Sequence, residues 1–162
     1  MSDILQSDSG AEFSDCRTYR YCLWRRWDKS KPYMMIIGLN PSTADETEDD
    51  PTIRRCKRFA SDWGYGGIVM TNLFAIRTKD PKIMMAHNSP TGRYNDEYLS
   101  KLSVYAGLVL AAWGNHGTHL SRDWEVRKLI EQTTQMYCLG LTKIGQPRHP
   151  LYIKADTNPV RF

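Results

Sequence analysis

Polar residues that can bind a ligand follow apolar or stiff segments at three places in this chain. The turn 38–42, with the sequence Gly-Leu-Asn-Pro-Ser, comes directly after the apolar run 34–37, and Asn72 ends a second apolar run. The segment 148–150, Arg-His-Pro, lies near the C-terminal end. In open α/β sheets, ligands bind at the carboxyl edge of the strands, where such residues meet. The sequence therefore predicts one site assembled from distant parts of the chain.

Strands that alternate with helices must position these residues. Apolar runs end in turn residues at four places and predict four core strands, near 34–39, 68–72, 108–112 and 136–139. Asp50 and Pro51 have the types preferred at a helix N-cap and first helical position. This order predicts an α/β fold, a three-layer α/β/α sandwich around a mostly parallel four-stranded sheet.

An N-terminal β-hairpin is expected to add to that sheet. The segment 17–27 alternates as a strand does, and the turn 28–32 joins it to the first core strand. We expect residues 1–16 to be a flexible tail and residues 17–162 to form a single α/β domain, because 162 residues suffice for one core.

The charge distribution favours an anionic partner. The chain has 22 Lys and Arg against 18 Asp and Glu, and the segments 17–31 and 142–154 are locally basic. A basic region beside a polar site is typical of nucleotide or nucleic-acid binding, although ordinary solvated surface charge explains the same balance. Trp24 and Trp27 lie in the first basic segment and offer rings on which bases could stack.

Neither a metal nor another cofactor is predicted. The four cysteines form no Cys-x-x-Cys pair, and His116 and His119 have no carboxylate or thiol pair near them in the sequence. No apolar run approaches the ~20 residues that span a bilayer, and the first ten residues lack the pattern of a signal peptide. We expect a cytoplasmic protein without a membrane partner; its oligomeric state is not predicted.

Six segments of the chain resemble the family called domain of unknown function 1643, and the resemblance extends over roughly residues 17–155. The matching segments are 40–45 (Asn-Pro-Ser-Thr-Ala-Asp), 49–56 (Asp-Asp-Pro-Thr-Ile-Arg-Arg-Cys), 63–65 (Trp-Gly-Tyr), 72–75 (Asn-Leu-Phe-Ala), 112–114 (Ala-Trp-Gly) and 147–152 (Pro-Arg-His-Pro-Leu-Tyr).

Three short motifs also resemble the uracil-DNA glycosylase superfamily. The turn 38–42 is similar to the Gly-x-Asn-Pro-Gly motif of its mismatch-specific branch, with serine in place of the last glycine. Asn72 matches the asparagine that ends the next core strand, and 149–151 matches part of a His-Pro-Ser motif. The resemblance implies a protein that binds a nucleobase in nucleic acid or a nucleotide, in DNA repair or base modification, with hydrolysis of the N-glycosidic bond as the reaction.

The same resemblance implies a role for each matching residue. Asn72 would read the base, since an asparagine amide offers both donors and an acceptor. Asn40 would position the water, and His149 would donate a hydrogen bond to the base as negative charge develops. The remaining expected contacts fall into two groups. The base or ligand would touch Gly38, Leu39, Pro41, Ser42 and Leu151, and phosphates would bind Arg54, Arg55 and Arg148.

Three other functions remain open at this stage. A binding module on the same fold would hold a base or nucleotide without cleaving it. A nucleotide hydrolase or transferase would use the acidic segment 45–50 with a divalent ion. A purely structural or partner-binding protein is the third.

Overall fold

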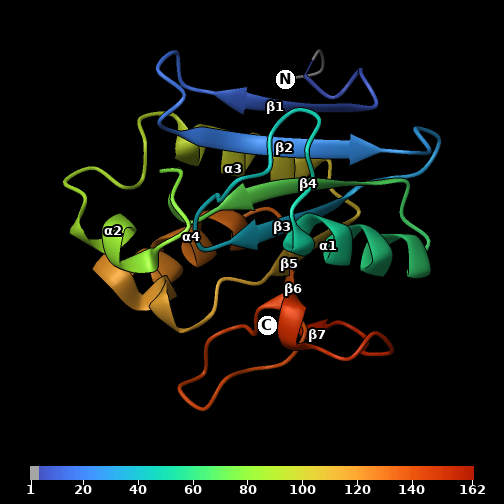
Figure 1. Ribbon diagram of the computed structural model, residues 1–162. Helices are drawn as coiled ribbons and strands as arrows, with labels where there is room; N and C mark the ends of the chain where they lie inside the picture. The colour runs from blue at the N-terminus through green and yellow to red at the C-terminus, as the bar shows by residue number, and fades with distance from the viewer. Residues whose placement is uncertain (1–3) are drawn as a thin grey trace.

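Seven strands form one mixed sheet in the computed structural model, which describes residues 4–162 (Figure 1). The strands follow one another across the sheet in the order β1-β2-β4-β3-β5-β6-β7. Their bounds are β1 Ser9–Phe13, β2 Arg20–Arg26, β3 Met34–Gly38, β4 Gly67–Asn72, β5 Leu108–Ala111, β6 Met136–Cys138 and β7 Val160–Arg161. The α/β class predicted from the sequence is confirmed.

The centre of the sheet is parallel and its two sides are antiparallel. β3 pairs in parallel with both β4 and β5, and β5 pairs in parallel with β6. The sheet is larger than the four strands expected, because β1 and β2 add antiparallel strands beside β4 and β7 adds one beside β6. The chain therefore leaves β3 on one side to form β4 and returns on the other side to form β5, which creates a topological switch point between β3 and β5.

The N-terminal region differs from both expectations for it. The expected hairpin between 17–27 and 33–39 is wrong: β2 pairs with β1 and β4, because both sides of β3 are occupied by β4 and β5. β1 lies within the segment 1–16 that was expected to be a flexible tail, where its backbone pairs with β2. Residues 1–3 of that segment lie outside the described residues.

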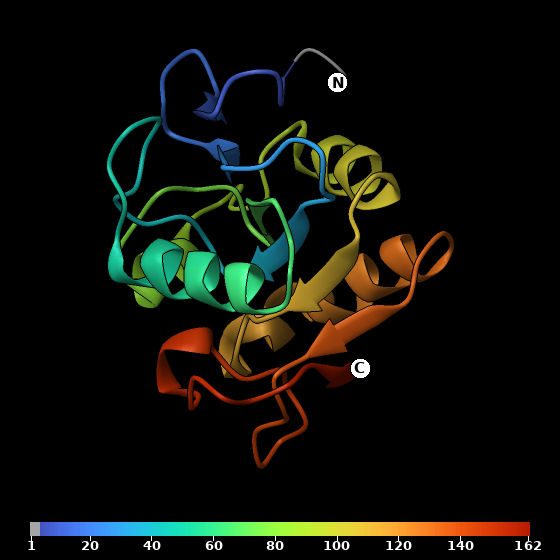
Figure 2. The ribbon, with the colours of Figure 1, turned by 90° about the vertical axis from the view of Figure 1, so that its right-hand side faces the viewer.

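Side chains alternate between two cores on opposite faces of the sheet. Met35 and Ile37 of β3 belong to the core that α3 and α4 cover. Met34 and Ile36 belong to the other core, which α1 covers (Figure 2). The helices are α1 Pro51–Asp62, α2 Pro81–Ala86, α3 Asn95–Val104 and α4 Arg122–Glu131, with 3₁₀ segments η1 Asn115–Ser121 and η2 Pro150–Tyr152. None of the helices in residues 4–162 is long and apolar enough to cross a membrane.

Helix α1 begins as its sequence predicts. The Asp50 side chain accepts a hydrogen bond from the backbone N–H of Ile53 at 2.9 Å, and Pro51 occupies the first turn. Asn95 is the first residue of α3, one position after the N-cap residue; it is fully buried, and its amide contacts the end of β4. Ser121 does precede α4, but its side chain makes no capping hydrogen bond.

Candidate functional site at the carboxyl edge of the sheet

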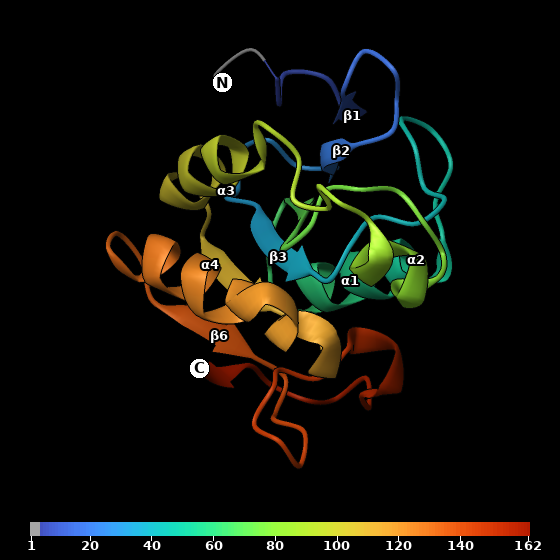
Figure 3. The same cartoon turned by 90° about the vertical axis from the view of Figure 1, so that its left-hand side faces the viewer.

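A cavity of about 440 Å³ lies at the edge where the parallel strands end. Its wall comes from the turn after β3, the end of β4, the segment after β5 and the segment that contains η2. Figure 3 looks toward this edge, which is the side to which the arrowheads of β3 and β4 point in Figure 1. The volume lies within the range of small-molecule sites, and the place is the switch point at which open α/β sheets bind ligands.

Asn40, Asn72 and His149 all line this cavity, although they are far apart along the chain. The five residues expected to touch the base or ligand line it as well. These are Gly38, Leu39, Pro41, Ser42 and Leu151. The parallel topology explains the convergence, since it brings the ends of β3 and β4 to the same side. The roles assigned to these residues remain predictions.

The Asn72 amide is buried in the cavity wall without a polar partner. Its side chain is only 4 % exposed, and its Nδ2 donates no hydrogen bond within residues 4–162. Gly38 provides the room that the amide occupies: a Cβ at Gly38 would lie 2.8 Å from Asn72 Oδ1. An unpaired buried donor costs about 1–3 kcal/mol, and a ligand that accepts this hydrogen bond recovers that cost.

Two buried residues that the sequence analysis did not assign to the site hold the end of β4 in place. Asn95 Nδ2 donates to the carbonyl oxygens of Asn72 at 2.9 Å and Leu73 at 3.0 Å. Arg122 Nε donates to the same Leu73 carbonyl at 2.8 Å. α3 and α4 thereby fix the backbone from which the Asn72 side chain projects. Only the fold could reveal this, because both residues resemble ordinary helix-start residues in the sequence.

Asn40 uses its nitrogen to hold a neighbouring loop. Asn40 Nδ2 donates to the carbonyl oxygens of Thr78 at 2.8 Å, Pro41 at 3.1 Å and Ile76 at 3.4 Å. Its Oδ1 accepts no hydrogen bond from residues 4–162. The amide is therefore fixed in orientation and retains an oxygen acceptor for a water or a ligand group.

His149 is held in a form that can donate a hydrogen bond. Its Nδ1 accepts the backbone N–H of Leu151 at 3.3 Å, so in the neutral ring the proton is on Nε2. Burial lowers the pKa of His149, and the nearby charge of Asp50 opposes that shift. A neutral imidazole with an Nε2–H donor is therefore favoured near neutral pH.

Asp50 and Arg20 also line the cavity, and the sequence analysis did not place either of them in the site. Asp50 is the only carboxylate among the residues that line it, and one of its oxygens caps α1. Arg20 begins β2, which runs antiparallel to β4, so its position is at the edge where β4 ends. The sequence analysis could not place Arg20 in the site, because the expected hairpin paired β2 with β3 instead of β4.

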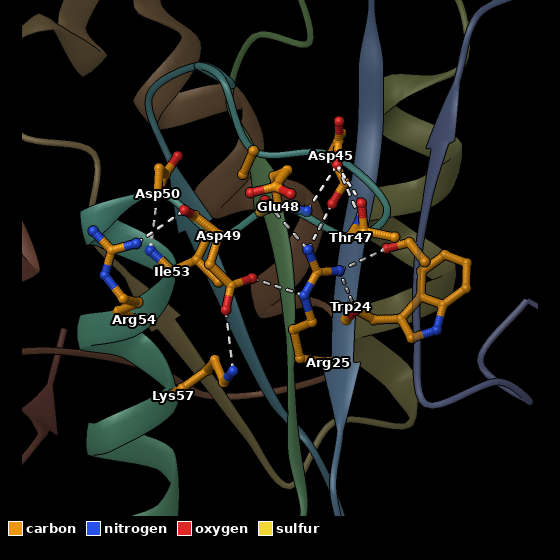
Figure 4. A network of polar contacts seen from close by, with 12 residues as sticks. Trp24, Arg25, Asp45, Thr47, Glu48, Asp49, Asp50, Ile53, Arg54 and Lys57 are labelled. Carbon is orange, nitrogen blue, oxygen red and sulfur yellow. Dashed lines mark hydrogen bonds and ion pairs between the residues drawn. The ribbon is translucent and has the colours of Figure 1, made fainter.

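Asp45 and Asp49 of the acidic segment 45–50 have partners within the protein (Figure 4). Asp49 binds Arg25 Nε at 2.8 Å and Lys57 Nζ at 3.0 Å, and burial raises its pKa less than these two cations lower it. Asp45 Oδ1 accepts the backbone N–H groups of Thr47 at 2.9 Å and Glu48 at 2.8 Å. These contacts position the start of α1.

The acidic side chains of the segment 45–50 do not form one cluster. No group of three or more His, Cys, Asp or Glu side chains in residues 4–162 is arranged to hold a metal. The carboxylates of 45–50 also point to different partners instead of one centre (Figure 4).

The three arginines expected to bind phosphate lie outside the residues that line the cavity. Arg54 is exposed and donates to the carbonyl of Asp49 at 3.0 Å. Arg55 donates to the carbonyl of Ile153, which follows η2, and lies over the ring of Phe59. Arg148 is exposed. Arg55 thus connects α1 to the segment that contains His149, while phosphate binding by these arginines remains a prediction.

Of Trp24, Trp27, His116 and His119, only His116 lies among the residues that line the cavity. Trp24 is buried in a core, and its indole N–H donates to the carbonyl of Ser7. Trp27 is 43 % exposed but does not line the cavity. His116 lines it, whereas the ring of His119 packs against Phe74.

The comparison with protein families agrees with the first resemblance drawn from the sequence. Residues 20–151 match the family described as Protein of unknown function (DUF1643), and the chain belongs to this family. Searches of curated proteins and of solved structures found no match.

Proposed function

We propose that this protein binds a nucleobase, in a nucleotide or in nucleic acid, in the cavity at the carboxyl edge and hydrolyses its N-glycosidic bond. The proposal includes a three-layer fold of the uracil-DNA glycosylase type, which the superfamily motifs and the two-sided helix packing support. Those motifs supply the substrate class, and the geometry of the cavity supports the roles.

The observation that carries the proposal is the unpaired amide of Asn72. A donor that is buried without a partner destabilises the protein unless a ligand completes it. A nucleobase edge carries carbonyl oxygens and ring nitrogens that an amide can pair with, and the wall of the cavity beside Asn72 is partly apolar through Ile36 and Met70. A flat ring with a polar edge fits this combination.

The remaining lining residues support the chemistry of bond cleavage. In the proposed reaction, the bond between the sugar carbon and the base nitrogen breaks and its electron pair goes to the base. His149 Nε2–H donates to a base oxygen as this negative charge develops. Asn40 Oδ1 orients the attacking water, and the Asp50 carboxylate stabilises the positive sugar and accepts the proton that the water loses. The base anion then takes a proton from solvent.

A non-catalytic binding module is the second candidate, and one observation favours it. The Asn40 nitrogen is bonded to three loop carbonyls, which is what a purely structural asparagine in a turn would do. In that case Asn72 and His149 would bind a base without any product being formed.

A cleavage assay separates the two candidates. Oligonucleotides that carry uracil, hypoxanthine or a modified pyrimidine are incubated with the wild type and with Asn40→Ala, His149→Ala and Asn72→Leu. Loss of the hydrogen-bond donor to the base or of the group that positions the water is expected to reduce turnover by about 100-fold or more. Arg58→Ala is the matched control, since Arg58 is exposed, lies outside the cavity and is assigned no contact with the substrate, so its turnover should equal that of the wild type.

Binding measurements decide the case in which no cleavage is seen. Wild-type binding of uracil or a mononucleotide that is lost in Asn72→Leu, without product, would establish the binding module. Turnover that is unaffected by Asn40→Ala and His149→Ala would reject the assigned roles. Failure of every base, nucleoside and nucleotide to bind would reject the proposed function itself.

A further inference from the structure

Arg20 is a buried cation without a charged partner in the cavity wall. Its residue is 3 % exposed, and it forms no ion pair with any carboxylate in residues 4–162. Its Nη1 donates to the carbonyl of Ala44 at 2.8 Å, but its Nε is buried and has no hydrogen-bond partner there. A buried charge destabilises the folded protein unless it is paired. Within the described part of the chain, the Arg20 guanidinium therefore lacks a counter-ion and a hydrogen-bond acceptor for its Nε.

The charged groups near Arg20 do not neutralise its positive charge, because they include two other arginines and one carboxylate that forms no ion pair with it. Burial lowers its pKa to about 10, the nearby Asp50 opposes that shift, and Arg77 and Arg25 add to it. Arg25 is already neutralised by Asp49, whereas Arg77 forms no ion pair within residues 4–162. Asp50 is therefore the carboxylate that faces this group, and it forms no direct ion pair with Arg20.

We propose that Arg20 forms an anion subsite within the cavity, and that the ligand is a nucleotide whose phosphate pairs with the Arg20 guanidinium while its base reaches Asn72. The base half of this inference rests on the proposed function; the anion half rests on Arg20 alone. An arginine presents parallel N–H donors that match the oxygens of a phosphate, and such charge-assisted bonds are stronger than neutral ones. Unlike Arg54, Arg55 and Arg148, Arg20 lines the cavity.

The test compares ligands that differ only in the phosphate. Uridine, uridine 5′-monophosphate and uridine 3′-monophosphate are titrated into the wild-type protein by calorimetry. We expect the better nucleotide to bind about 10- to 100-fold more tightly than uridine. Inorganic phosphate should raise the melting temperature and compete with the nucleotide. A single-stranded oligonucleotide that contains uracil shows whether a phosphodiester fills the subsite as well as a terminal phosphate.

Arg20→Gln removes the charge and keeps a polar, though shorter, side chain. We expect it to bind uridine as the wild type does but to lose the preference for the nucleotide, so that the ratio of the two Kd values falls to about 1. Arg20→Lys should keep part of the preference, because it retains the charge without the fork of donors. Arg58→Gln is the control and should keep the full ratio, because Arg58 is exposed, lies outside the cavity and is assigned no phosphate contact.

The outcomes separate this inference from the proposed function. Equal affinity for uridine and both nucleotides in the wild type, or a preference that survives in Arg20→Gln, would overturn the subsite. Stabilisation by phosphate that Arg20→Gln abolishes, without binding of any base or nucleoside, would support the subsite and reject the proposed function. If Arg20→Gln does not fold, the wild-type ligand series and Arg20→Lys decide.

Discussion

The missing side chain of Gly38 leaves the space that the Asn72 amide occupies. The turn after β3 approaches the end of β4 so closely that a Cβ at position 38 would meet the Asn72 amide. The sequence identified both residues as candidates because each lies at the end of an apolar run. The sequence did not show that Gly38 makes room for the Asn72 side chain, since this contact is between two strands that are distant in the sequence.

Gly38→Ala is expected to displace the Asn72 amide and weaken ligand binding by about 10-fold or more, as expected when one buried hydrogen bond is lost. Calorimetric titration with uracil or a mononucleotide measures the effect. Gly145→Ala is the control: Gly145 has a φ of 84°, so the change costs stability, but it lies outside the cavity and should leave the affinity unchanged. Equal affinity of Gly38→Ala and the wild type would show that the amide does not contact the ligand.

The pH dependence of ligand binding follows from His149. Because its folded-state pKa is below the ordinary value of 6.5, the neutral ring is present at pH 7 and is lost only as the pH falls through that lowered value. Protonation would also remove the acceptor for the Leu151 N–H. We therefore expect activity and this contribution to stability to be complete above pH 6.5 and to decline with a midpoint below it.

Profiles of kcat/KM, or of affinity, against pH test this in the wild type and in His149→Gln, which does not titrate. The acid decline should be absent in the variant. A decline that is identical in both proteins would assign it to another group.

At the scale of elements, the start of α1 combines stability with the site. The residues Asp50-Pro51 predicted the N-cap, and the structure confirms it. The tertiary contacts attach the acidic segment before it to the sheet: Arg25 of β2 binds the Asp49 carboxylate and the Asp45 carbonyl (Figure 4). Two carboxylates of the acidic segment, Asp45 and Asp49, thus help to attach a loop to the sheet and to α1.

Two substitutions at Asp50 separate its cap from its charge. Asp50→Ala should lower the free energy of unfolding by about 1 kcal/mol, because the Ile53 N–H loses its acceptor. Asp50→Asn keeps a capping oxygen and should remain within a few tenths of a kcal/mol of the wild type. Urea denaturation measures both.

Turnover should fall in both Asp50 variants if the carboxylate takes part in the reaction. Wild-type turnover in Asp50→Asn would restrict Asp50 to its structural role. Equal losses of stability in the two variants would contradict the cap.

At the scale of the whole molecule, two cores enclose the sheet and three of the four cysteines. Cys22 and Cys138 are buried with β2 and β6, and Cys56 is buried in α1. Burial raises the pKa of Cys22 and of Cys56 to about 12. Cys16 is exposed, and hydrogen bonds with Ser14 and Thr18 lower its pKa to about 7.

Thiol labelling of the folded protein at neutral pH is therefore expected to modify Cys16 alone and rapidly, because the thiolate is the reactive form. In denaturant all four cysteines should react. A spectrophotometric thiol reagent gives the stoichiometry, and Cys16→Ser should reduce the native count to zero. Rapid modification of more than one thiol in the native wild type would contradict the packing of the two cores.

The sequence by itself determined the α/β class, the positions of the four core strands, the start of α1 and the polar residues at the strand ends. These features are local: hydrophobic runs, turn residues and caps act within a few positions along the chain. Asn40, Asn72 and His149 could be named as candidates for the same reason.

Only the tertiary structure decided which strands pair and what each polar side chain contacts. The partner of β2, the strand β1, the support of β4 by Asn95 and Arg122, and the place of Arg20 in the cavity wall all depend on contacts between distant segments. Such pairing is set by competition among strands for free edges and by the burial of polar groups. This competition involves segments that are far apart in the sequence, so it cannot be predicted from the pattern of neighbouring residues.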